Sequence, residues 1–200
     1  MTRLPGAAEI VEFHDYCLAA PGAPARFKEG VWAAIEANHW HNGMLWEQED
    51  LARRRDVADS DIASNKRAID GHNQKRNDAI ERIDEALLAA LSEVKAKKDA
   101  RLSSETAGAM IDRLSILSLK IKAMREQTQR TDVDAAHIAS CRAKLERLQE
   151  QRADLAGCLD RLLAEAERGE STFKVYRQFK MYNDPKLNPA LYHEAARHKT

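Results

Sequence analysis

Apolar residues recur every three or four positions through most of this chain, which is the spacing of helices that bury one face. Proline, the strongest helix breaker, does not occur between Pro24 and Pro185. The turns between successive predicted helices are short, so neighbouring helices should run antiparallel as hairpins. With its capping signals, the pattern predicts four long helices, at residues 27–55, 60–98, 103–129 and 133–168.

The predicted fold class is all-α, an up-down antiparallel bundle of these four helices. We expect a single domain over residues 1–200. Residues 1–26 form an N-terminal segment with a short helix, residues 27–98 and 103–168 form the two hairpins, and residues 171–200 form a C-terminal segment.

Aromatic residues occur only in two end regions, between Phe13 and Trp46 and between Phe173 and Tyr192. The middle of the chain must therefore build its core from aliphatic side chains, as helical bundles do. Because a ring needs a large covering area, we expect the two end regions to meet. The aromatic and basic C-terminal segment should pack on one end of the bundle, as a lid over the aromatic end of the first long helix.

The two hairpins should have different inner faces. The second has an ordinary apolar seam, whereas the helical spacing of the first carries Asn38 and Asn42 inward, opposite Asn77 and Asn73. Buried amides cost stability unless they are paired. Three interpretations stay open: a polar network that sets the register, a ligand pocket within the hairpin, and a different register that leaves these residues in solvent.

If the polar face is a pocket, its neighbours extend the candidate site. The start of the third long helix offers hydroxyls and free amides that suit an anion, although capping explains them too. Rings and basic groups of the C-terminal segment would close the groove. The candidate ligand-binding residues are Asn38, His39, Asn42, Glu49, Asn73, Asn77, Asp78, Glu81, Trp32, Ser104, Thr106, Tyr176, Lys180, Tyr182 and Asn183.

Two E-x-x-D pairs, Glu47 with Asp50 and Glu81 with Asp84, have the spacing of magnesium ligands on one helix face. The predicted register separates the pairs by about 24 Å, so one metal cluster within a chain cannot hold both. An antiparallel dimer could bring them together. We favour solvated helix faces, and we expect no metal site and no cofactor, since the chain has no zinc spacing and no phosphate-binding glycine loop.

The charge balance narrows the class of partner. The chain has 32 Lys and Arg against 32 Asp and Glu, which argues against a protein built to bind nucleic acid. It lacks the roughly 20 apolar residues in succession that a membrane helix needs, and its first residues do not resemble a signal peptide. Three cysteines without C-x-x-C spacing suit a reducing compartment, so we expect a cytoplasmic protein.

Four polar strings resemble a bacterial family catalogued only as a domain of unknown function. They are NHxxNxxLWxxEDxAR from Asn38, KRxIDxxNQxRND from Lys66, SETxGxxIDRLSIL from Ser104 and YRQFKMYNDPxLNP from Tyr176. The resemblance implies an all-α fold. Through the genes beside which such proteins are encoded, it also implies a link to glycosyltransferases and to surface-polysaccharide or lipopolysaccharide synthesis. It implies no catalytic residues.

The leading hypothesis is a binding or accessory protein of surface-glycan synthesis. Its polar groove would receive a sugar, a nucleotide sugar or a partner glycosyltransferase, with Trp32 or Tyr176 against a sugar ring. A first alternative is a metal-assisted hydrolase or transferase acting on a phosphorylated or glycosylated substrate, with Asp78 or Glu81 as base or ligand. A second is a purely structural homo-oligomer. The sequence alone leaves open whether the protein is an enzyme.

Overall fold

The computed structural model describes residues 3–179, 181 and 184–190, and it is mostly helical. The predicted all-α class is confirmed. No helix in these residues is long and apolar enough to cross a membrane. Within the described residues, the helices with assigned bounds are α1 (Ala7–Ala19), α2 (Gly30–Leu51), α3 (Asp59–Ala90), α4 (Ala107–Thr128) and α5 (Ala135–Glu167).

Helix α3 ends at Ala90, eight residues before the predicted boundary. The chain that follows bonds instead to the segment after α5: Lys97 N donates to Gly169 O at 2.8 Å. Two short parallel strands, β1 (Arg101–Leu102) and β2 (Ser171–Thr172), continue this contact. Gly169 permits the close approach, because it has a φ of 70° and a Cβ there would lie 2.4 Å from Lys95 O. These non-local bonds compete with a longer helix.

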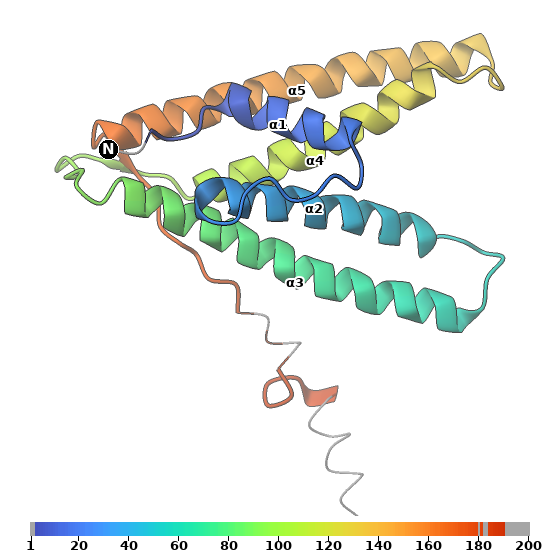
Figure 1. Cartoon of the computed structure of the whole chain (residues 1–200), viewed down its shortest axis with the longest axis horizontal. Helices are drawn as coiled ribbons and strands as arrows, with labels where there is room; N and C mark the ends of the chain where they lie inside the picture. The colour runs from blue at the N-terminus through green and yellow to red at the C-terminus, as the bar shows by residue number, and fades with distance from the viewer. Residues whose placement is uncertain (1–2, 180, 182–183, 191–200) are drawn as a thin grey trace, which may run out of the picture.

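The helices form two hairpins, α2 with α3 and α4 with α5, that diverge toward their turns (Figure 1). Helix α4 is central and packs on all four other helices. Helix α1 lies against α4, α5 and α2, where a closed bundle of four would bring α5 directly against α2. Among the described residues α5 makes no close backbone approach to α2 or α3. The two hairpins therefore spread apart, and α1 packs between α2 of one hairpin and α4 and α5 of the other.

The hydrophobic core lies where the hairpins converge. Phe13 contacts the rings of Phe27 and Trp32 edge-on, with centroids 5.6 Å apart in both cases. Phe173 is buried in the same core, although among the described residues no ring contact joins it to Phe13, Phe27 or Trp32. The largest fully buried apolar side chains are Ile10, Ile35, Ile83, Leu87, Ile111, Leu114, Ile121, Leu159 and Leu162.

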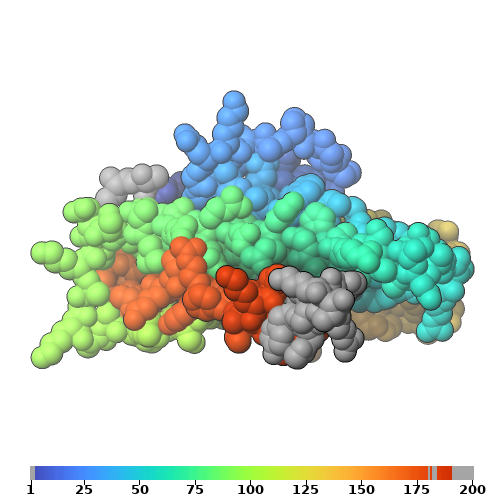
Figure 2. Space-filling model, turned by 90° about the horizontal axis from the view of Figure 1, so that it is seen from below, coloured from blue at the N-terminus to red at the C-terminus, as the bar shows by residue number. Residues whose placement is uncertain are grey.

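The C-terminal segment does not form the predicted lid. Seen from below (Figure 2), the described part of the segment lies in front of α3, and in Figure 1 the same part passes α3 and then leads away from the bundle. Its Arg177 pairs with Glu81 and Glu85 of that helix. Phe179 is 86% exposed, and Tyr176 is half exposed. The acidic face of α3 holds this basic segment, and of its rings beyond Phe173 the two that the structure describes, Tyr176 and Phe179, are exposed.

Candidate functional site

The buried asparagines of α2 point to α4 rather than to α3. Asn38 Nδ2 and Asn42 Nδ2 both donate to Asp112 Oδ1, at 2.8 and 2.9 Å. All three residues are buried. The predicted pairing of these asparagines with Asn77 and Asn73 is therefore not the one formed. The acceptor is a carboxyl group, and it comes from the other hairpin.

Sequence reasoning missed Asp112, although a signal for it exists. Asp112, Ser115 and Leu119 follow one another at helical steps of three and four, and all are buried. They form a second inward stripe beside the apolar seam that faces α5. A carboxylate on such a stripe needs donors from another element, because an unpaired buried charge is very costly.

Two histidines extend the polar cluster toward α1. His39 Nδ1 shares a hydrogen bond of 2.8 Å with Ser115 Oγ, and the His39 ring stacks on His14 with centroids 4.4 Å apart. Burial lowers the pKa of His39 to about 4. It also lowers the pKa of His14 well below its usual value, with further lowering from the charges of His39 and Arg152. Both rings are therefore neutral near pH 7.

A cavity of about 370 Å³ opens beside Asn42, between α2, α3 and α4. Arg76 lies at its wall, with its side chain 26% exposed and its Nε 3.9 Å from Asp112 Oδ1. This Nε is buried and has no hydrogen-bond partner in the described residues. Glu49 pairs with Arg53 at 3.1 Å. The lining residues are Asn42, Leu45, Trp46, Glu49, Asp50, Arg53, Asn73, Arg76, Ile116 and Leu119.

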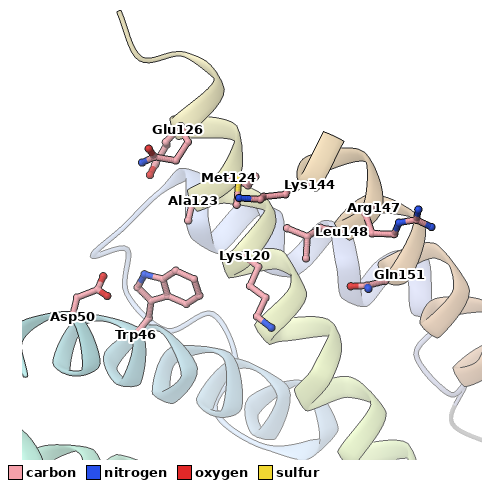
Figure 3. Close-up of a pocket in the computed structure, with 11 residues that line it drawn as sticks. Trp46, Asp50, Lys120, Ala123, Met124, Glu126, Lys144, Arg147, Leu148 and Gln151 are labelled. Carbon is pink, nitrogen blue, oxygen red and sulfur yellow. The ribbon is translucent and has the colours of Figure 1, made fainter. Parts of the chain in front are cut away.

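A larger groove of about 650 Å³ lies between α2 and the α4/α5 hairpin. It shares Trp46 and Asp50 with the cavity. Figure 3 shows the Trp46 ring projecting from α2 into the space that faces α4. Lys120 and Lys144 line the opposite wall, from α4 and α5. The two spaces therefore meet at one tryptophan.

Of the candidate residues, the structure brings Asn42, Glu49 and Asn73 to the cavity. Asn38 and His39 belong to the buried cluster behind it. Sequence reasoning did not place Trp46, Asp50, Arg53 and Arg76 in the site. Their inward helical spacing from Asn42 and Asn73 is the signal that could have found most of them.

Other candidates on α2 and α3 lie elsewhere. Trp32 packs in the aromatic core. Asp78 accepts a hydrogen bond from Gln74 Nε2 on an exposed face. Asn77 Nδ2 donates to Gln178 Oε1 at 2.8 Å, and Glu81 binds Arg177. These last contacts anchor the C-terminal segment.

The start of α4 is capped by protein groups. Thr106 Oγ1 accepts from Ala109 N at 3.2 Å, while Ser104 is exposed. Asp84 Oδ1 accepts from Gly108 N at 2.7 Å, so a carboxylate of α3 already occupies this positive helix end. Burial raises the pKa of Asp84, and its bonds to Thr106 and Gly108 oppose that rise. The helix end that the sequence suggested as an anion site is thus occupied by a carboxyl group of the protein itself, that of Asp84.

The remaining candidates belong to the C-terminal segment. Tyr176 lies on its described part, away from the cavity lining. Lys180, Tyr182 and Asn183 lie outside the described residues. Within the part of the chain that the structure describes, no three His, Cys, Asp or Glu side chains gather as metal ligands.

The comparison with known families agrees with the resemblance seen in the sequence. The model of a family described as "Protein of unknown function (DUF4254)" matches residues 32–175, from α2 to just beyond β2. No curated protein and no solved structure matches the chain. Since the matched residues make up most of the sequence and include the whole lining of the cavity, the chain belongs to the DUF4254 family.

Proposed function

We propose that this protein is a binding protein for a sugar-bearing ligand, a sugar or a nucleotide sugar, which it holds in the cavity between α2, α3 and α4. The observation that carries the proposal is the lining: one cavity combines the Trp46 ring with amide, carboxylate and guanidinium groups. Its volume of about 370 Å³ is at the small end of ligand sites, which suits one sugar ring better than an oligosaccharide.

The chemistry of a sugar ring matches this lining. A sugar has an apolar face of C–H groups and a rim of hydroxyls that both donate and accept hydrogen bonds. Trp46 offers a flat aromatic surface for the first, and Asn73, Glu49 and Asp50 offer donors and acceptors for the second. Arg76 also lines the cavity and adds a guanidinium group, which can only donate.

The buried cluster gives the site a rigid wall. Asn42 Nδ2 bonds inward to Asp112 and to Ser115 Oγ, at 2.9 and 3.0 Å. The Oδ1 atom of Asn42 is left without a protein donor among the described residues, so it can accept from a ligand. A group held by packed neighbours loses little entropy when it binds. The asparagines thus set the position of a binding group and also link the two hairpins.

A role beside glycosyltransferases in surface-glycan synthesis is part of this proposal, and the family resemblance supports it. Compared with binding, metal-assisted hydrolysis draws little support from the described residues. Of the acidic pairs considered for magnesium, Glu81 binds Arg177 and Asp84 caps α4. We therefore propose an accessory or binding role, with a partner transferase as the receiver of the bound sugar.

A thermal-shift screen against neutral sugars, sugar phosphates, nucleotide sugars and divalent metals tests the proposal. A ligand at about 100 times its Kd stabilises the fold by roughly 2.7 kcal/mol. The shift should disappear in Trp46→Ala and in Asn73→Leu. The matched control is Trp40→Ala, because Trp40 is on the same helix, is 55% exposed and does not line the cavity.

The proposal fails if no sugar-bearing ligand shifts the melting temperature, or if Trp46→Ala and Trp40→Ala respond alike. Hydrolysis of a nucleotide sugar that depends on added magnesium or manganese would favour the enzyme instead.

A further inference from the structure

The geometry points to a ligand that carries phosphate: its sugar lies in the cavity beside Asn73, and its phosphate groups lie in the groove beside Lys120 and Lys144. This inference rests on the proposed sugar site and adds the chemical class of the ligand. It starts from the adjacency of the two spaces, since both are lined by Trp46 and Asp50, whose side chains in the groove are drawn in Figure 3. A ligand seated against one side of Trp46 can extend past it into the groove.

The volumes suit a ligand with two parts. The cavity of about 370 Å³ accommodates a small group, while the groove of about 650 Å³ is larger. A single sugar would leave the groove unused. A sugar joined to phosphate groups, with or without a nucleoside beyond them, would occupy both spaces and bury more of its surface.

The groove has basic groups that no protein carboxylate neutralises. Lys120 and Lys144 come from different helices, and neither forms an ion pair in the described structure. Their neighbours are paired: Lys122 binds Glu126 at 2.6 Å, and Arg147 binds Glu150 at 2.9 Å. Two ammonium groups across one groove are suited to the spread charge of a phosphate or diphosphate.

The unpaired lysines also orient the ligand. In the cavity, Arg53 is paired with Glu49, and Arg76 Nε lies 3.9 Å from Asp112 Oδ1, so a protein carboxylate already lies near each guanidinium group. In the groove, Glu126 is paired with Lys122, and Lys120 and Lys144 form no ion pair among the described residues. The anionic end of the ligand should therefore face the second hairpin, and the hydroxyl-bearing end should face the cavity.

The anionic part can be tested without knowing the sugar, by titrating the protein with inorganic pyrophosphate in a calorimeter. We expect Lys120→Met/Lys144→Met to weaken pyrophosphate binding at least about tenfold. The matched control is Lys28→Met/Lys98→Met, which removes the same net charge from exposed positions outside the groove lining. It should bind as the wild type does, within about twofold. Unchanged far-ultraviolet circular dichroism checks that both variants fold.

The outcomes separate this inference from the sugar site. Equal loss in the two double variants, or no pyrophosphate binding to the wild type, overturns the phosphate groove. If a neutral sugar still shifts the melting temperature in that case, the proposed sugar site stands and only the phosphate groove is rejected. If pyrophosphate binding depends on Lys120 and Lys144 while no sugar-bearing ligand binds, the groove is upheld as an anion site and the proposed function fails.

Discussion

Removing the carboxylate of Asp112 should be among the most destabilising single changes outside the apolar core. Its Oδ1 accepts from Asn38 Nδ2 and Asn42 Nδ2, and it lies 3.9 Å from Arg76 Nε. Asp112→Ala leaves the buried Asn38 amide without an acceptor, at a cost of about 1–3 kcal/mol, while Asn42 Nδ2 keeps its bonds to Ser115 Oγ and Asn38 Oδ1. It also leaves the Arg76 guanidinium without the carboxylate 3.9 Å from its Nε. We expect a total loss of about 2–4 kcal/mol in the free energy of unfolding.

Urea denaturation followed by circular dichroism measures this loss. Asp112→Asn keeps an acceptor oxygen and should lose only about 1–2 kcal/mol. Glu126→Ala is the control, because it removes an exposed carboxylate from the same helix and should cost at most about 1 kcal/mol. In a double-mutant cycle, Asn42→Ala should cost less in the Asp112→Ala background than alone. A loss below about 1 kcal/mol for Asp112→Ala would refute the reasoning.

Acid should destabilise the fold through His39. Burial holds the folded-state pKa of His39 at about 4, so only the unfolded chain gains a proton on this side chain as the pH falls below about 6.5. The free energy of unfolding should therefore fall by about 2 kcal/mol between about pH 7.5 and pH 5. Denaturation of His39→Gln at both pH values should show a smaller drop, and an equal drop would exclude His39 as the cause. Gly108→Ala should lower stability by about 1–3 kcal/mol, since its Cβ would lie 2.6 Å from Ile80 O, whereas Gly157→Ala, with open space around its Cβ, should raise it by about 0.5–1 kcal/mol. Similar melting temperatures for the two variants would contradict this. Arg177→Gln should speed amide hydrogen exchange in the segment after β2, because it removes that segment's ion pairs to α3. Unchanged exchange would show that other contacts hold it.

The helices could be predicted from the sequence because their signals are local. Periodic apolar positions and the absence of proline located α2, α4 and α5 to within a few residues at each end. The predicted helices are slightly longer than the observed ones. The end of α3 could not be located, since it depends on bonds between Lys97 and Gly169, which are far apart in the sequence. The place of α1 between the hairpins is likewise a tertiary property.

Only part of the site could be predicted from the sequence. The helical spacing correctly placed Asn38 and Asn42 on an inward face, since that needs only the geometry of one helix. Their partner could not be found by pairing residues within one hairpin, because Asp112 belongs to the other. The groove depends on how far the hairpins diverge, so no local pattern indicated Lys120 or Lys144.

Fluorine NMR of protein labelled with 5-fluorotryptophan tests the central claim most directly. The chain has three tryptophans, and Trp→Phe variants assign their resonances. Trp46 lines the cavity, Trp32 is in the aromatic core, and Trp40 is exposed on α2. The account predicts that a sugar or nucleotide sugar moves the Trp46 resonance in a saturable way and leaves the other two in place. If no such ligand moves it, or if Trp40 or Trp32 responds instead, the cavity between the hairpins is not the binding site.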